Sequence, residues 1–532
     1  MSFHPLAQLL AWAVLTVLSP LSQNATGDWP TYRHDGGRTG NQPVASDLSD
    51  PRRVRSLAVR SRWRLPGVAD GFAAAPVVHA NRAYVGGSNG ILYALDARTL
   101  RVVWQYPRAG EQPLAQQWHC SGFPSNRGIA SSATVARIGA RDAVIFGAPD
   151  NSLAPHYGSG RLFALDAETG HLMWASPAIA AITDTIVGAT GRHEQIGYSA
   201  PLVLGGRVYI GVSDACADHP VQTGRVVAVD LETGRLVPAF RFVATGTRGG
   251  GVWSSVATDD RALFVTTGNA HCYPAVPACP QVAPTPDYAS SMLEVRARDG
   301  HVEWQFQPVP FAMDSDADFG AGPTVARTRC GRVVTSIQKD GWVYAIGADG
   351  PNPRGRVRWQ FPADHYPFHI GDGSRHVGTA MTNYVRPGAA WGGETFVTSR
   401  GGGHGTIQAL DVCAADSARV AWSLRVPHAS TRWDGMSAPS VTGGIIYVGT
   451  NEGGSGHVVA FADPRIRPPA GPTCLDPSLP PNACAASGGR LVPVPEVLAS
   501  VPLGGGIRAE PVLAHGRVYV TTTNGYVYML SP

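Results

Sequence analysis

The stretch GRLFALDAETGHLMW, residues 160–174, carries the pattern that decides the fold. A short apolar strand comes first, the letters DAETG have the composition of a tight turn, and a second strand ends at Trp174. Related copies are LYALDARTLRVVW at 92–104 and GRVVAVDLETGRLV at 224–237. A strand–turn–strand unit that recurs in this way predicts a repeated array of small antiparallel sheets.

Eight copies of this unit can be followed along the chain. They end at Trp104, Trp174, Val237, Trp304, Trp359, Trp422, Asp463 and Leu530. The last copy stops after its inner strands, whereas VRSRWRLP at 59–66 is a closing strand, with the expected Trp, that has no unit of its own. We therefore predict an all-β fold: an eight-bladed β-propeller of four-stranded antiparallel blades, with the ring closed by N- and C-terminal strands. This predicts a single domain over residues 26–532, with a solenoid or two four-bladed lobes as alternatives.

The composition suits many short strands and excludes one class of partner. The 532 residues include 63 Gly and 43 Pro, and only 15% are charged, as expected for strands joined by tight turns. The net charge of +4 is mild and no dense basic stripe is present, so nucleic acid is not an expected partner. Arg supplies nearly all of the positive charge, and the single Lys is Lys339.

The N-terminus has the pattern of an export signal. Residues 9–18 form an apolar run that is short for a bilayer span, and small and polar residues follow it. We expect a signal peptide over residues 1–25, a periplasmic or secreted protein, and no transmembrane segment in the mature chain.

The cysteine pattern agrees with an oxidising compartment. The chain has eight Cys, and two pairs, Cys272 with Cys279 and Cys474 with Cys484, lie close in sequence within Pro-rich stretches, as disulfide partners do. No Cys-x-x-Cys-His is present, so covalent c-type haem is not expected in this chain.

The copies at 92–104 and 160–174 resemble the repeat of pyrroloquinoline-quinone (PQQ) dehydrogenases. They equally resemble non-catalytic propellers of related sequence, such as the outer-membrane assembly scaffold lipoprotein. Because a fold does not fix a function, the loops at the strand ends have to decide between the two classes. These loops are most similar to those of the polyvinyl-alcohol-dehydrogenase-like quinoproteins.

Two loop segments carry the cofactor-binding part of this resemblance. NRGIA at 126–130 contains Arg127, and the resemblance implies that its guanidinium binds a carboxylate of the quinone. GGGVWSSVATDDRALFVTTGN at 249–269 contains Trp253, which would form a flat surface under the quinone ring. It ends at Asn269, whose amide oxygen would bind Ca²⁺.

Two further segments carry the catalytic part. DADFGAGP at 316–323 contains Asp318, in the place of the family's general base and in reach of the metal, with Asp314 and Asp316 as neighbouring alternatives. QKDGWVYAI contains Lys339, in the place of a cation that donates to the reactive quinone oxygens. A lone Lys among many Arg residues suggests that the ammonium group itself is required.

The sequence departs from the family pattern in two places. Cys216 stands where related alcohol dehydrogenases have a calcium-binding Glu, so Asp214 or Asp218 would have to supply that oxygen. The adjacent Cys pair of the family is missing, since Cys120 has no neighbouring Cys, and a bridge from Cys120 to Cys216 is one alternative. The resemblance also assigns Ser213 to the cofactor.

Together these residues predict an exported dehydrogenase that oxidises a small or polymeric alcohol by hydride transfer to bound PQQ, with Ca²⁺ as a second cofactor. Electrons would pass to an external acceptor such as a cytochrome c or a membrane quinone. The alternative is a non-catalytic propeller that serves as a protein-interaction scaffold in the cell envelope. The enzyme requires the site side chains to surround one pocket, whereas the scaffold does not.

Overall fold

In the computed structural model, the architecture is described for most of the chain. The described residues are 27–67, 71–72, 74–114, 116–117, 126–150, 159–181, 194–196, 199–214, 223–246, 248–269, 285–308, 318–319, 321–328, 330–339, 342–348, 355–362, 381–384, 394–399, 405–414, 419–430, 435–464, 466–474, 481–486 and 489–532.

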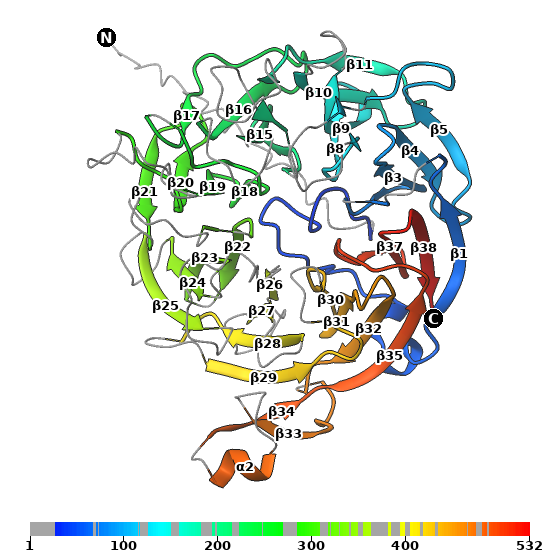
Figure 1. Ribbon diagram of the computed structural model, residues 1–532, viewed down its shortest axis with the longest axis vertical. Helices are drawn as coiled ribbons and strands as arrows, with labels where there is room; N and C mark the ends of the chain where they lie inside the picture. The colour runs from blue at the N-terminus through cyan, green and yellow to red at the C-terminus, as the bar shows by residue number, and fades with distance from the viewer. Residues whose placement is uncertain are drawn as a thin grey trace, which may run out of the picture.

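Nearly all described strands belong to antiparallel sheets of four or five strands (Figure 1). The sheets are β2(Val77–His79), β3(Arg82–Gly86), β4(Leu92–Asp96), β5(Val102–Tyr106); β8(Thr134–Ile138), β9(Arg141–Asp150), β10(Ser159–Asp166), β11(Leu172–Ala175), β12(Ala180–Ala181); β13(Glu194–Gln195), β14(Leu202–Leu204), β15(Arg207–Asp214), β16(Arg225–Asp230), β17(Phe242–Val243); β18(Ala257–Thr258), β19(Ala262–Thr266), β20(Met292–Arg296), β21(Val302–Phe306); β22(Thr324–Thr328), β23(Gly331–Ile337), β24(Trp342–Gly347), β25(Arg356–Pro362); β26(Met381–Tyr384), β27(Glu394–Ser399), β28(Thr406–Asp411), β29(Arg419–Arg425); β30(Ser440–Thr442), β31(Ile445–Gly449), β32(Gly456–Ala462), β35(Glu496–Leu503); and β36(Val512–Ala514), β37(Arg517–Thr521), β38(Tyr526–Ser531) with β1(Ala58–Arg64).

Smaller elements complete the described fold. They are the two-stranded sheets of β6(Gln116–Gln117) with β7(Asn126–Arg127) and of β33(Gly471–Cys474) with β34(Leu491–Val494), and the short helices η2(Asp47–Ser49), α1(Pro51–Val54) and α2(Pro481–Ala486).

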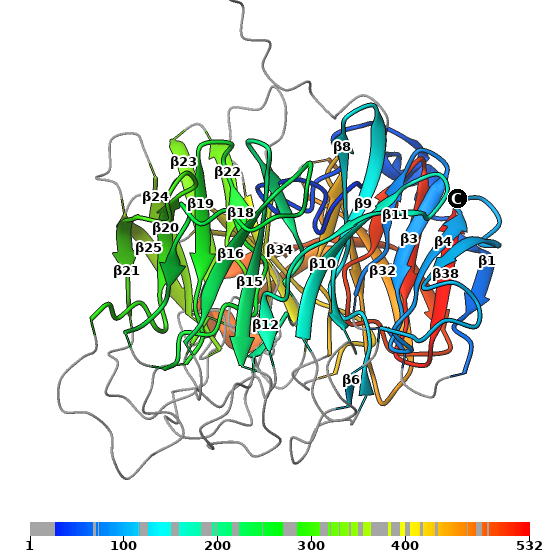
Figure 2. The same ribbon diagram turned by 90° about the horizontal axis from the view of Figure 1, so that it is seen from above.

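The sheets stand side by side around a common centre, with the first strand of each innermost (Figure 1). Seen from the side, the strands run between the two faces of the ring (Figure 2). The N-terminal strand β1 pairs with the C-terminal β38, and Trp63 lies opposite Val527. The all-β prediction is therefore confirmed, and the antiparallel sheets have the arrangement of a β-propeller.

The repeat motif explains how neighbouring sheets hold together. Asp166 Oδ1 accepts hydrogen bonds from the backbone N–H and hydroxyl of Thr169, at 2.9 and 2.8 Å, and so shapes the turn between β10 and β11. Gly170 follows with φ +71°, and a Cβ there would lie 2.6 Å from the ring of Trp104 in the preceding sheet. The packed indole therefore leaves no room for a side chain at this position, and the positive φ favours glycine as well.

Tryptophans that close the repeats contact the next sheet. Trp104 Nε1 donates to the carbonyl of Ala167 at 3.2 Å. The same contact recurs from Trp174 to Leu231 at 3.0 Å and from Trp359 to Val412 at 3.2 Å. In these three copies the closing Trp of the sequence motif is therefore an inter-sheet contact.

Disulfides confirm one cysteine prediction and add a pair that was not predicted. Cys474 and Cys484 are bonded, joining β33 to α2 in an excursion between β32 and β35 that projects from the ring (Figure 1). Cys330 and Cys413 are also bonded and link the sheets of β22–β25 and β26–β29. The predicted Cys272–Cys279 pair lies outside the described residues, as does the predicted signal peptide. No described helix is long and apolar enough to cross a membrane.

A histidine–aspartate cluster joins the first and last sheets at the chain termini. Asp28 Oδ2 lies 3.0 Å from His79 Nδ1, and its Oδ1 lies 2.7 Å from His515 Nε2. His79 Nε2 is also 3.1 Å from Asp142, which Arg137 contacts from the other side at 3.0 Å. Hydrogen bonding to Asp28 raises the pKa of His79, although burial acts in the opposite direction.

This cluster predicts a pH-dependent stability. The raised pKa means that the protonated ring stabilises the fold fully below about pH 6.5, the unfolded value, and that this contribution is lost as pH rises through the folded pKa. We expect His79→Gln to remove part of the stability at pH 5.5 and much less at pH 8.5, as measured by urea unfolding. The exposed His171→Gln serves as control. Equal losses at both pH values in His79→Gln would contradict the role of the cluster.

Candidate active site

The candidate residues lie at one edge of their sheets. The first and second strands of each sheet are antiparallel, so the loop entering the first strand and the loop leaving the second meet at the same edge. Trp253 and Asp318 precede the first strands β18 and β22, whereas Asn269 and Lys339 follow the second strands β19 and β23. Ser213 lies at the same end of the second strand β15.

Backbone hydrogen bonds hold the Trp253 segment between two sheets. Val252 N donates to the carbonyl of Val212, next to Ser213, at 3.2 Å. Gly250 N donates to the carbonyl of Asn269 at 2.8 Å. The segment before β18 is therefore fixed to the end of β15 on one side and to the loop after β19 on the other.

A buried ion pair beside an indole forms the centre of the site. Lys339 Nζ lies 2.9 Å from Asp318 Oδ1, and Lys339 N donates to the Asp318 carbonyl at 2.9 Å. The side chains of Lys339 and Asp318 are 7% and 1% exposed. The same ammonium lies 5.6 Å from the ring centroid of Trp253, in the range of a cation–π contact. What points to function is the combination of a buried ion pair with an adjacent indole at the edge of the sheets where the other candidate residues lie.

Gly268 lies between the aromatic and acidic groups. A Cβ on this residue would lie 3.2 Å from Asp318 Oδ2 and 3.3 Å from Trp253 Nε1. The Trp253 indole and the Asp318 carboxylate therefore both approach the backbone beside Asn269, which is itself buried. Sequence reasoning assigned no role to Gly268, and its only signal was its place in the Thr-Gly-Asn triplet.

Buried hydroxyl groups support the site from behind. Ser254 Oγ and Thr266 Oγ1 are hydrogen-bonded at 2.8 Å, and Thr266 Oγ1 donates to the Ala321 carbonyl at 3.0 Å. Ser336 Oγ donates to the same carbonyl at 2.9 Å. These bonds connect the segments that carry Trp253 and Lys339.

The other sequence-predicted residues are only partly described. Ser213 is buried, and Asp214 ends β15 opposite Glu194, but the side chain of Asp214 lies outside the described residues. Arg127, in β7, pairs with Gln116 of β6, and the side chain of Arg127 likewise lies outside the described residues. The remaining candidates outside the described residues are Cys120, Cys216, Asp218, Asp314 and Asp316.

The described residues fit a flat anionic cofactor. Trp253 is partly exposed although its neighbours Val252 and Ser254 are buried, and an indole has the flat apolar face that a ring system packs against. Lys339 supplies the positive charge beside it. The fit for Ca²⁺ is partial: Asn269 and Asp318 offer oxygen ligands, whereas Ca²⁺ takes about 6–8. Within the described ranges, no group of three or more His, Cys, Asp or Glu side chains is arranged to hold a metal ion.

Comparison with known proteins shows the family to which this chain belongs. A β-propeller family model, described as the PQQ-type glucose/ethanol/alcohol dehydrogenase β-propeller domain, matches residues 29–350. The chain belongs to this PQQ dehydrogenase-like family, which confirms the resemblance found in the repeats and loops.

Individual relatives are distant but match over most of this chain. The chain is 23% identical over 498 residues to polyvinylalcohol dehydrogenase of Sphingopyxis sp. (strain 113P3), covering 83% of this chain and 66% of the relative. It is 25% identical over 531 residues to quinohemoprotein alcohol dehydrogenase ADH IIB of Pseudomonas putida, covering 84% and 70%. The chain therefore spans about two thirds of the length of these relatives. The crystal structure of quinohemoprotein alcohol dehydrogenase from Comamonas testosteroni matches with a TM-score of 0.63 at 20% identity, over 95% of this chain and 80% of that chain, which shows a shared fold.

Proposed function

We propose that this protein is an exported quinoprotein dehydrogenase that oxidises an alcohol with bound PQQ. The observation that carries the proposal is the buried Lys339–Asp318 pair beside the partly exposed Trp253. A propeller that serves only as a scaffold has no need to bury a carboxylate and an ammonium group next to a partly exposed indole. Membership of the PQQ dehydrogenase-like family supports the same conclusion.

Each described residue has a role in this proposal. When bound, PQQ supplies the two-electron redox chemistry of alcohol oxidation. Trp253 packs against the ring of the cofactor, and Asp318 accepts the proton of the substrate hydroxyl. Lys339 holds the Asp318 carboxylate in place at 2.9 Å and adds positive charge where negative charge develops.

The remaining cofactor contacts come from residues that are placed only in part. Arg127 and Ser213 complete the binding of PQQ, and Asp214, with Asn269 and Asp318, completes a site for Ca²⁺. Support for these roles comes from the position of Ser213, Asp214 and Asn269 at the site edge of their sheets.

The wider setting of the enzyme is also part of the proposal. The sheets would be the eight blades of one closed domain over residues 26–532, which the pairing of β1 with β38 supports. The protein would act in the periplasm or outside the cell after removal of a signal peptide. Its substrate would be a small or polymeric alcohol, and electrons would pass to an external acceptor such as a cytochrome c.

Reconstitution tests this function directly. Purified protein is incubated with PQQ and Ca²⁺, dialysed, and assayed by dye-linked oxidation of primary, secondary and polymeric alcohols. We expect retained quinone absorbance and turnover of at least one alcohol class. Absence of both would leave the scaffold as the better explanation of the fold.

We expect Trp253→Ala to weaken PQQ binding by about tenfold to a hundredfold, since stacking of a flat ring on an aromatic side chain is worth about 1–3 kcal/mol. Equilibrium titration of the apo-protein with PQQ measures the effect, and Trp253→Phe should restore most of the affinity. Trp63→Ala, which removes a partly exposed indole from the outer strand β1, is the matched control. An equal loss of affinity in both alanine variants would refute a specific role for Trp253.

A further inference from the structure

The N-terminal segment, residues 27–42, passes through the centre of the ring (Figure 1). It contacts the first strand of one sheet after another. Its backbone contacts are Trp29 N to Val78 O at 2.8 Å, Val135 N to Pro30 O at 2.7 Å, Thr258 N to Gly36 O at 2.7 Å, Val325 N to Gly37 O at 2.8 Å and Val441 N to Gly40 O at 2.9 Å. They belong to β2, β8, β18, β22 and β30.

These contacts satisfy groups that the fold would otherwise leave without partners. The first strand of each sheet is an edge strand facing the centre, and a buried edge N–H is costly without an acceptor. The N-terminal segment offers carbonyls to Val135, Thr258, Val325 and Val441 in four different sheets. It is therefore part of the packed interior and not a loose leader to the first sheet.

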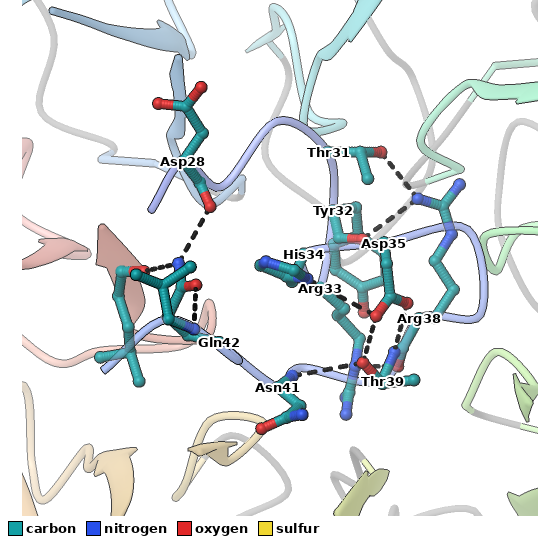
Figure 3. A network of polar contacts seen from close by, with 12 residues as sticks. Asp28, Thr31, Tyr32, Arg33, His34, Asp35, Arg38, Thr39, Asn41 and Gln42 are labelled. Carbon is teal, nitrogen blue, oxygen red and sulfur yellow. Dashed lines mark hydrogen bonds and ion pairs between the residues drawn. The ribbon is translucent and has the colours of Figure 1, made fainter. Parts of the chain in front are cut away.

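Arg38 anchors this segment with its side chain (Figure 3). Its Nε donates to the Val256 carbonyl at 3.0 Å, and its Nη2 donates to the Pro201 carbonyl at 3.2 Å. Its Nη1 donates to Thr31 Oγ1 at 2.8 Å, and this hydroxyl lies 2.8 Å from Thr134 Oγ1. The guanidinium thus binds directly to the segments that enter β14 and β18 and reaches β8 through Thr31.

Arg38 remains charged in this position. It is only 1% exposed, and burial lowers the pKa of its guanidinium to about 10, which still leaves it protonated at neutral pH. A buried charge that donates to several carbonyls has little freedom to move, because each lost bond leaves the charge less compensated.

The backbone of the segment also fits closely. A Cβ on Gly37 would lie 2.5 Å from the Val325 carbonyl oxygen, and one on Gly36 would lie 2.8 Å from the Thr258 side chain. The two glycines therefore let the segment approach the inner strands without intervening side chains.

The segment lies behind the candidate site. Trp253 precedes β18, whereas Arg38 reaches Val256 and Gly36 reaches Thr258, which come three and five residues further along the same chain direction. In the next sheet Asp318 likewise precedes β22, and the segment contacts Val325 within that strand. Along the inner strands, the candidate site residues therefore come first and the contacts of the N-terminal segment follow a few residues later.

We propose that residues 27–42 close the centre of the ring behind the candidate site and that Arg38 is a positioning residue that holds the Trp253 segment in place. The first half of this proposal is independent of the chemistry. The second half rests on the proposed function, because it assigns the fixed Trp253 segment to cofactor binding.

Hydrogen exchange of the cofactor-free protein tests whether residues 27–42 close the centre of the ring. In Arg38→Met we expect peptides that contain Val135, Thr258, Val325 and Val441 to exchange at least about tenfold faster, since local opening of this segment exposes their amides. Peptides from the outer strands β5 and β21 should exchange as in the wild type. Arg53→Met, on the exposed face of α1, is the control and should match the wild type throughout.

Two outcomes would overturn this half of the proposal. One is unchanged exchange of the inner-strand peptides in Arg38→Met. The other is equal acceleration of the outer strands, which indicates global destabilisation. If Arg38→Met does not fold, Gly37→Ala replaces it, with Gly471→Ala as control because a Cβ there meets nothing within 4 Å.

Titration with PQQ tests the positioning role. We expect Arg38→Met to bind PQQ about tenfold more weakly than the wild type, and Arg38→Lys, which keeps the charge and some of the donors, to recover part of the affinity. Wild-type affinity in an Arg38→Met protein whose inner strands exchange faster would overturn the positioning role. Failure of the wild type to bind PQQ would instead refute the proposed function, while the exchange result would stand.

Discussion

Asp318→Asn is expected to lower kcat for alcohol oxidation by about 10²- to 10⁴-fold, the usual contribution of a general base. The amide has nearly the same shape as the carboxylate but cannot take up the hydroxyl proton. PQQ binding should persist, because Trp253 and Lys339 are unchanged. Dye-linked steady-state kinetics measures the loss, and quinone absorbance after dialysis shows that the cofactor is still present.

The chain offers a matched control for this variant. Asp259, in the hairpin between β18 and β19, forms a second buried ion pair with Arg332 at the start of β23, and the two side chains are 2% and 9% exposed. This hairpin lies at the edge of the sheet opposite to the candidate site. Asp259→Asn should therefore disturb stability in a comparable way but retain turnover. Similar kcat values for the two variants would contradict the assignment of Asp318 as the base.

Much of the fold could be predicted because its determinants are local. The turn bonds of Asp166 span three residues, within a motif that recurs along the sequence. The Cys474–Cys484 bond joins residues only ten apart. Signals of this length can be read in a single stretch of sequence.

The features that escaped prediction depend on contacts between distant segments. The Cys330–Cys413 bond spans 83 residues, and no local pattern links its partners. Arg38 meets Val256, which is 218 residues away, and the segment around it has no strand or helix periodicity. Such residues look like an ordinary polar loop until the ring brings the inner strands around them.

The candidate site shows the same division. Lys339 is the single Lys of the sequence and Asp318 lies in a family motif, so each could be predicted separately as a site residue. Their direct pairing was not predicted, since it depends on the turn after β23 meeting the loop that enters β22. The role of Gly268 was not predicted, because its missing side chain leaves room for Trp253 and Asp318, and that contact is visible only in the structure.

The pairing itself predicts the largest effect on stability. Lys339→Met should lower the free energy of unfolding by about 3–5 kcal/mol, because removing one partner of a buried ion pair leaves the other charge poorly compensated. Urea unfolding of the cofactor-free protein measures this loss. The double variant Asp318→Asn with Lys339→Met should be more stable than Lys339→Met alone, since it removes the uncompensated carboxylate as well.

A variant of the Asp259–Arg332 pair shows which effects of Lys339→Met come from lost stability alone. Arg332→Met breaks the pair with Asp259 and should destabilise the protein by a similar amount while retaining PQQ binding and turnover below its unfolding temperature. Lys339→Met should lose turnover under the same conditions, because its ammonium group lies between Asp318 and Trp253. If Lys339→Met is as stable as the wild type, the charge of Asp318 is not compensated by this ammonium group. If Lys339→Met keeps full turnover, Lys339 has no role in the reaction.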